Sequence, residues 1–335
     1  MNKIFKVIWS KSKQCYIVVS EIAKNKTGKK KIVVASILAA LAMAGSMQSV
    51  DATIPEGNAT GNDAFAIGPQ SNVNGAFGFA IGNNAKFNSG TLGFAIGVNS
   101  EAKSNQSIAI GYLSKATGRN NGGGGDPALA VGAGANATAG GATAIGMVAN
   151  ASNTYATAIG KSAAASGDSS IAIGQNTKAT QEKAIAIGDT SQATNIGATA
   201  LGRSSEATGS SATALGSLAS ATGTTATAVG MQASASGSES LAIGNTASAT
   251  SGRALAVGTN AKATGASSVA VGSGAGNSGP LGFASSINSL GSVVNSLKTI
   301  NYATTAEGDY AVALGVYANA KNSGVAVGQN ALAAT

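Results

Sequence analysis

Ala156-Thr-Ala-Ile-Gly160 is followed by Lys161-Ser-Ala-Ala-Ala-Ser-Gly167, and the same phrase returns at Ser170-Ile-Ala-Ile-Gly174. The glycine that closes the phrase recurs at a constant spacing of 14 residues. A fixed period indicates a repeat protein, in which each unit buries its apolar side against its neighbours. These predicted corner glycines are Gly132, Gly146, Gly160, Gly174, Gly188, Gly202, Gly216, Gly230, Gly244, Gly258 and Gly272.

Each repeat has two short halves that alternate in side-chain type and end in glycine. This pattern predicts two strands per coil, with glycine giving the backbone its freedom at the corner. A 14-residue coil has a contour of about 46 Å, which suits a flattened, two-sided roll. Successive coils would stack about 4.8 Å apart through parallel backbone hydrogen bonds.

Alternation also sorts the side chains of a coil. Ala156 and Ala158 face one way while Thr157 and Ile159 face the other. Alanines from both halves would fill a narrow interior and leave the aliphatic residues outside. The reverse arrangement, with the large aliphatic residues inside and the alanines outside, satisfies the same alternation.

With the alanines inside, the outward aliphatic residues stack into a continuous apolar stripe. A stripe of this size marks an association surface, and we therefore predict an obligate oligomer. The predicted interface column comprises Ile145, Ile159, Ile171, Ile173, Ile185, Ile187, Leu201, Leu215, Val229, Ile243, Val257 and Val271.

The repeats predict a main array over residues 53–272, with an inserted loop at 112–127. Glycines and a proline in Arg119-Asn-Asn-Gly-Gly-Gly-Gly-Asp-Pro127 punctuate that loop. A second insertion is expected at 273–310, where apolar residues spaced by three and four suggest a short helix over 285–300. Resumed coils are expected at 311–335.

Residues 25–52 read as a secretory signal peptide. Lys29-Lys-Lys31 precedes the apolar run from Ile32 to Ala44, and cleavage is expected near Ala44 or Ala52. The alternative is a transmembrane helix, but this run is short of the roughly 20 residues that a span needs. Residues 1–24 form an additional N-terminal segment, which an ordinary signal peptide does not need.

The chemistry-bearing residues are sparse. The net charge of +8 arises within the leader, so no basic face for nucleic acid is predicted. The chain has no histidine, its single cysteine is Cys15, and its acids are scattered. We predict no catalytic residues, no metal site, no cofactor and no enzyme activity, since a glycosidase, for example, needs paired carboxylates.

Two stretches resemble a known family. Met-Asn-Lys-Ile-Phe-Lys-Val-Ile-Trp, followed by the block from Cys15 to Glu21, resembles the extended signal peptide region of autotransported proteins. Ser170–Gly174 and Ser267–Gly272 resemble the Asn-Ser-Val-Ala-Ile-Gly phrase of YadA-like head repeats in trimeric autotransporter adhesins. The resemblance implies an all-β fold, a left-handed parallel β-roll, and a homotrimer of three chains side by side.

The resemblance also implies a function and a location. A head of this family attaches a bacterium to host matrix, host cells or other bacteria by multivalent binding, from the outer membrane of a Gram-negative-type cell. The family's membrane anchor is not found in this sequence, so we expect a fragment of a longer adhesin, with a truncated gene as the alternative. The alternatives are a spacer rod without a ligand and an ice-binding solenoid. The ice-binding alternative relies on Thr143, Thr157, Thr199, Thr213 and Thr227, a column that Ile171 and Ile185 interrupt.

Overall fold

The computed structural model describes residues 5–10, 15–20, 56–119, 127–273 and 303–334. The chain divides into two compact units, Met1–Thr53 and Ile54–Thr335. In the first unit, β1 (Phe5–Ser10) and β2 (Cys15–Ser20) form an antiparallel hairpin. Within the described residues, no helix has the length and apolarity needed to cross a membrane.

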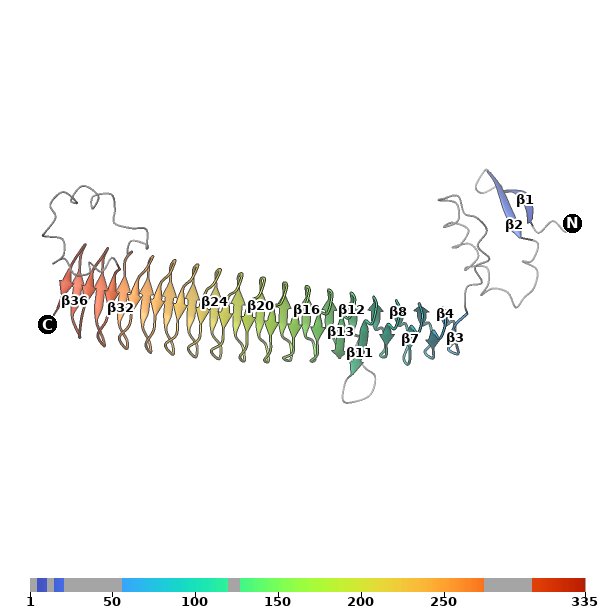
Figure 1. Ribbon diagram of the computed structural model, residues 1–335, viewed down its shortest axis with the longest axis horizontal. Coiled ribbons are helices and arrows are strands. Elements are labelled where there is room, and N and C mark those ends of the chain that lie inside the picture. The colour runs from blue at the N-terminus through green and yellow to red at the C-terminus, as the bar shows by residue number, and fades with distance from the viewer. Residues whose placement is uncertain (1–4, 11–14, 21–55, 120–126, 274–302, 335) are drawn as a thin grey trace, which may run out of the picture. The chain divides into compact units, whose positions relative to one another are not determined.

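The second unit is a stack of coils, each contributing one strand to each of two parallel sheets (Figure 1). The first sheet contains 17 described strands of three residues each. They are β4 (Phe65–Ile67), β6 (Phe79–Ile81), β8 (Phe94–Ile96), β10 (Ile108–Ile110), β12 (Leu129–Val131), β14 (Thr143–Ile145), β16 (Thr157–Ile159), β18 (Ile171–Ile173), β20 (Ile185–Ile187), β22 (Thr199–Leu201), β24 (Thr213–Leu215), β26 (Thr227–Val229), β28 (Leu241–Ile243), β30 (Leu255–Val257), β32 (Val269–Val271), β34 (Val312–Leu314) and β36 (Val325–Val327).

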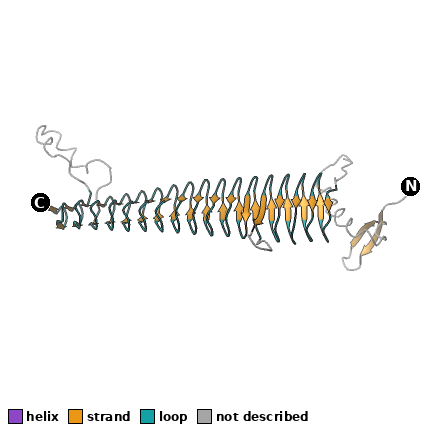
Figure 2. Cartoon of the chain, turned by 90° about the horizontal axis from the view of Figure 1, so that it is seen from below, coloured by secondary structure: helices purple, strands orange, loops and turns teal. Residues whose placement is uncertain are grey.

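The second sheet lies on the other side of the same coils, as the view in Figure 2 also shows. Most of its strands are two residues long. They are β3 (Asn58–Ala59), β5 (Asn72–Val73), β7 (Lys86–Phe87), β9 (Glu101–Ala102), β11 (Lys115–Arg119), β13 (Asn136–Ala139), β15 (Asn150–Ala151), β17 (Ala164–Ala165), β19 (Lys178–Ala179), β21 (Gln192–Ala193), β23 (Glu206–Ala207), β25 (Ser220–Ala221), β27 (Ser234–Ala235), β29 (Ser248–Ala249), β31 (Lys262–Ala263), β33 (Thr305–Ala306), β35 (Asn319–Ala320) and β37 (Leu332–Ala333).

The register of the first sheet aligns equivalent positions of successive coils. Thr157 lies opposite Thr143 in the preceding coil and Ile171 in the following one. The backbone N–H of Thr157 donates to the Ser170 carbonyl at 2.8 Å, which links adjacent coils. Parallel strands cannot be joined by a tight hairpin, and here the strand of the second sheet supplies the return path. The sequence repeat therefore places equivalent side chains of successive coils in register, in columns along the stack.

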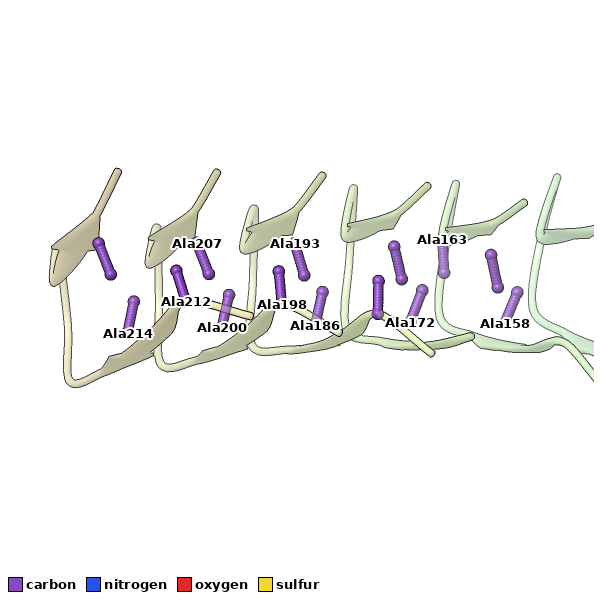
Figure 3. Close-up of a cluster of buried hydrophobic side chains, with 14 of the residues drawn as sticks. Ala158, Ala163, Ala172, Ala186, Ala193, Ala198, Ala200, Ala207, Ala212 and Ala214 are labelled. Carbon is purple, nitrogen blue, oxygen red and sulfur yellow. The ribbon is translucent and has the colours of Figure 1, made fainter. Parts of the chain in front are cut away.

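The interior of the stack is made of alanine. Ala156, Ala158, Ala163 and Ala165 are all fully buried, and the equivalent alanines of the other coils form one continuous core. In Figure 3, alanine side chains from the two sheets point toward one another between the ribbons. The prediction of an alanine interior is confirmed, and the alternative with large aliphatic residues inside is wrong. The two sheets approach so closely that a methyl group from each fills the space between them.

Two tight turns close each coil. Ala163 N–H donates to the Gly160 carbonyl at 3.3 Å, and Ser170 N–H donates to the Gly167 carbonyl at 3.2 Å. The third residue of each turn has a positive φ, +56° at Ser162 and +54° at Ser169, as a type II turn requires. A non-glycine residue in this region costs about 1–2 kcal/mol. Hydrogen bonds to the neighbouring coil hold these residues there, such as the 2.9 Å bond from Ser162 N–H to the Met147 carbonyl.

Parts of the two predicted insertions lie among the described residues and form strands. Lys115 and Ala116 pair in register with both β9 and β13, and the register shifts between Ala116 and Arg119. Residues 305–306 form β33, which pairs with β31, so the coil resumes before residue 311. The predicted helix at 285–300 lies outside the described residues.

One aromatic ring interrupts the alanine core. Phe87 is fully buried at a position where the preceding coil has Val73 and most other coils carry alanine. Glycines stand around it where a Cβ would collide: a Cβ on Gly78 would lie 2.2 Å from the Phe87 ring, and one on Gly93 would lie 2.0 Å from it. The Phe87 ring therefore fills the space that alanine side chains at positions 78 and 93 would otherwise occupy.

Candidate association face

The outer side of the first sheet carries the residues that the sequence predicts to associate. In β16, Ala158 is buried whereas Thr157 and Ile159 point outward and are half-buried within their own chain. We call the outward side chains of the first and last residues of the 17 first-sheet strands the aliphatic face. All 12 residues of the predicted column lie on it, Ile171 and Ile185 as first residues and the other ten as last residues.

The composition of the aliphatic face is uniform over the described strands. The last residue of every strand is isoleucine, leucine or valine. The first residue is aliphatic, threonine or phenylalanine, and no position on the face is charged. In the single chain Leu201 and Leu215 are each 41% exposed and Ile243 is 38% exposed. A continuous apolar surface of this extent is typical of a surface that another molecule covers.

Aromatic residues are confined to one end of the aliphatic face. Phe65, Phe79 and Phe94 are the first residues of β4, β6 and β8, and they lie opposite one another in register. The Phe79 and Phe94 rings are stacked, with centroids 5.1 Å apart and planes 3° from parallel. The Phe65 and Phe79 centroids are 6.0 Å apart and their planes are tilted by 52°. We call these three residues the phenylalanine cluster.

The outer side of the second sheet has the opposite character. Its strands begin with asparagine, lysine, glutamate, glutamine, serine, threonine, alanine or leucine. Glu101 and Lys103 form an ion pair of 2.9 Å there. The Thr180 hydroxyl donates to the Thr194 carbonyl at 3.4 Å, so hydroxyls bind the backbone of the next coil. The outer side of the second sheet is therefore suited to contact with water, and the aliphatic face of the first sheet is suited to packing.

Ionisable groups are not gathered into a catalytic arrangement in the described part of the chain. No group of three or more His, Cys, Asp or Glu residues that could hold a metal ion occurs among the described residues. Glu182 and Lys183 are exposed neighbours in a turn, with 2.7 Å between their charged atoms. Hydrogen bonding and charge attraction from Lys183 lower the pKa of Glu182, and the same interactions raise the pKa of Lys183. This exposed pair is a feature of the turn surface.

Serine residues in the interior were not anticipated from the sequence. Ser170 and Ser205 are fully buried at positions that alanine occupies in other coils. Each hydroxyl donates to the first carbonyl of the adjacent turn, Ser170 to Gly167 at 2.7 Å and Ser205 to Gly202 at 2.9 Å. The sequence could have indicated these buried serines, because alanine and serine alternate at the same position of the repeat and both are small enough for the interior.

The fold and the aliphatic face together define a class: a repeat rod, all-β in its described part, with one solvated side and one apolar side. Comparison with known families gives the particular family. Residues 1–49 match the model described as the extended signal peptide of type V secretion systems. Copies of the YadA head domain repeat match at 59–85, 89–120 and 124–149, in overlapping stretches from residue 151 to 275, and again from 302 to 331. The chain belongs to the family of trimeric autotransporter adhesins with YadA head repeats.

The family assignment confirms the resemblance drawn from the leader and from the repeated phrase. Both matched families describe export and adhesin-type structural domains rather than enzymes. The matched repeats coincide with the stacked coils. Function should therefore be sought on the surfaces of the rod.

Proposed function

We propose that residues 53–335 form the head of a cell-surface trimeric adhesin, with three chains side by side as left-handed rolls about the aliphatic face. The observation that carries the proposal is the uncharged aliphatic face, which extends over all 17 described strands of the first sheet. YadA-type heads form homotrimers in general. A second and a third copy of this chain would have aliphatic faces whose side chains repeat at the same spacing as those of the first.

Burial of the aliphatic face supplies the driving force for assembly. Full burial of one valine, leucine or isoleucine side chain contributes about 1.5–3 kcal/mol. These side chains are already half-buried within the chain, so each contributes a fraction of that value. The contribution recurs in every coil, and its sum over the rod exceeds the cost of association, which is about 4–15 kcal/mol.

The polar second sheet and the turns remain outward in such a trimer and would meet the ligand. A rod of repeated coils presents many similar sites, and linked weak sites raise the overall avidity. We propose host matrix, host cells or other bacteria as the targets. The extended signal peptide supports export, and the family supports a position at the surface of a Gram-negative-type bacterium.

The interface assignment is tested with a pair of aspartate variants. Ile159→Asp places a charge on the aliphatic face, whereas Lys161→Asp places one on an exposed turn two residues away. We expect Ile159→Asp to shift the population toward monomer in sedimentation experiments, and Lys161→Asp to leave it unchanged. Equal and negligible effects of the two substitutions would show that the column faces solvent.

The adhesive function is tested by binding purified trimer to surfaces coated with collagen, fibronectin or laminin, and to host or bacterial cells. The assembly-deficient Ile159→Asp protein provides the matched low-valency control. We expect saturable binding by the trimer to at least one surface and a large loss with the variant. Absence of binding to every surface would favour a spacer rod, and thermal hysteresis of the purified protein would favour ice binding.

A further inference from the structure

The periodicity of the aliphatic face creates a problem of alignment between chains. Successive coils present nearly the same pair of outward side chains, as in Ile171/Ile173 and Ile185/Ile187. One chain displaced along the rod by a single coil would still place aliphatic residues against aliphatic residues. Only the coils at the two ends would lose contacts. A regular face therefore favours association without fixing the register, as is general for strands with a uniform pattern.

The phenylalanine cluster is the strongest departure from this regularity. Phe65, Phe79 and Phe94 occupy the first positions of β4, β6 and β8, and the following strand begins with Ile108. Across the remaining described first-sheet strands, the face carries aliphatic residues and threonine. An aromatic block at one end distinguishes that end from every other segment of the face.

The cluster is also held in a defined arrangement. Phe79 lies opposite Phe94 in the backbone register, and their rings are stacked at 5.1 Å. Behind them the core differs from other coils, because Phe87 replaces alanine and is enclosed by Gly78 and Gly93. Aromatic pairs gain energy beyond the area that they bury, and they depend on ring geometry. A fixed stack therefore discriminates between a matching stack and an aliphatic side chain.

We propose that the phenylalanine cluster sets the axial register of the assembled chains, so that the clusters of all copies meet at one height. This inference rests on the trimer proposed above and names the contact that aligns it. The partner is a second copy of the same chain, because only a copy has a face of the same period ending in the same aromatic block. In a chain displaced by one coil, a ring would face Ile108 of a neighbour and another ring would lose its aromatic partner.

The experiment uses residues 54–335, whose described strands β3 to β37 pair only among themselves. This segment contains no cysteine. Leu215→Cys and Leu201→Cys are placed on separately tagged chains, which are co-assembled and oxidised. The two positions are neighbours in adjacent strands of the aliphatic face. A 215–215 disulfide reports aligned chains, whereas a 201–215 disulfide reports a displacement of one coil, because disulfide geometry tolerates little extra distance.

In the otherwise unchanged chain we expect same-position disulfides to exceed offset ones by about tenfold or more, the ratio for about 1.4 kcal/mol. The triple variant Phe65→Ile, Phe79→Ile and Phe94→Ile keeps the face aliphatic, and the offset disulfide should rise severalfold. The matched control Leu241→Ile, Leu255→Ile and Val269→Ile changes the same column elsewhere and should leave the ratio unchanged.

The outcomes separate the register from the assembly. Trimeric mass with an unchanged disulfide ratio in the phenylalanine variant would overturn the register proposal and leave the trimer standing. A monomeric mass of the chain that retains the three phenylalanines would overturn both the trimer and the register proposal. A trimer that forms neither disulfide in any background would show that positions 201 and 215 of different chains do not meet, which contradicts the contact between strand ends that the register proposal needs.

Discussion

At the scale of the residue, side-chain size decides where each position of the coil lies. Ala158 and Ser170 are fully buried, while Ile159 points outward. The interior is too thin for a larger group, so the usual rule that large aliphatic residues lie inside is reversed. The apolar residues that would form the core of an ordinary domain therefore lie on the outer side of the first sheet.

Enlarging an interior alanine should destabilise the rod. We expect Ala158→Leu to raise the free energy of the folded chain by about 1–3 kcal/mol through overpacking. Ala164→Leu, at a half-buried outward position of the second sheet, is the control and should change stability by less than about 0.5 kcal/mol. Urea unfolding followed by circular dichroism measures both. Equal midpoints for the two variants would contradict an alanine-filled interior.

A corner glycine and a glycine in the other turn of a coil should differ in their tolerance of a side chain. Gly160 has φ +131°, and a Cβ there would lie 2.4 Å from the Gly174 carbonyl oxygen. Gly197 has φ +63°, and the nearest atom to a Cβ would be the Ser211 hydroxyl at 3.5 Å. We expect Gly160→Ala to destabilise the rod by about 1–3 kcal/mol, and Gly197→Asn to be neutral. Thermal unfolding compares them, and an undisturbed Gly160→Ala protein would contradict the turn geometry.

At the scale of the element, each strand is stable only because its neighbours repeat it. Strands of two or three residues are too short to persist alone, and their backbone groups bond to the coils before and after. The constant period and the alternation were sufficient to predict an all-β solenoid with two strands per coil. They could not settle which side of a strand is buried, because alternation is symmetric. The burial of Ala158 in β16 and of Ala165 in β17 settles it.

Other features of the coil could not be predicted because they depend on contacts between coils. The positive φ of Ser162 arises from a hydrogen bond to the previous coil rather than from its own preference. The strand β11 lies within a stretch whose glycines suggested a loop. The twelve predicted column residues lie on the aliphatic face, and their contact with other chains remains a prediction. The phenylalanine cluster was visible in the sequence, but its stacking required the register.

The fit of the Phe87 ring against Gly78 and Gly93 allows a test of packing between strands of the two sheets. We expect Phe87→Ala to cost about 3–5 kcal/mol, because it leaves a cavity beside Gly78 and Gly93. Adding Gly78→Ala and Gly93→Ala rebuilds the alanine pattern of the other coils and should recover much of the loss. The two glycine substitutions without Phe87→Ala should destabilise the chain. Additive effects in a denaturation cycle would contradict direct packing of these residues.

At the scale of the whole molecule, the rod separates an apolar side from a polar side along its full described length. The aliphatic face carries no charge in the described strands, so assembly should not depend on ion pairs. The charged residues of the described coils occupy turns and the second sheet. In the proposed trimer, the repeated polar surface would face outward and the apolar residues would hold the copies together.

Salt should therefore leave the assembly intact. At about 1 M ionic strength the Debye length falls to about 3 Å, which screens exposed charges. We expect the oligomeric mass to be unchanged between low and high sodium chloride, and the thermal midpoint to stay constant or rise. Light scattering and thermal unfolding across the series measure this. Dissociation at high salt would show that charged contacts, rather than the aliphatic face, hold the chains together.

The most direct test of the aliphatic face as an interface is the mass of residues 54–335 in solution. Sedimentation equilibrium across a wide range of concentrations measures this mass without reference to shape. The account predicts one species of three times the chain mass, which shifts toward monomer in the Ile159→Asp variant. A monodisperse monomer with the native sequence would contradict it.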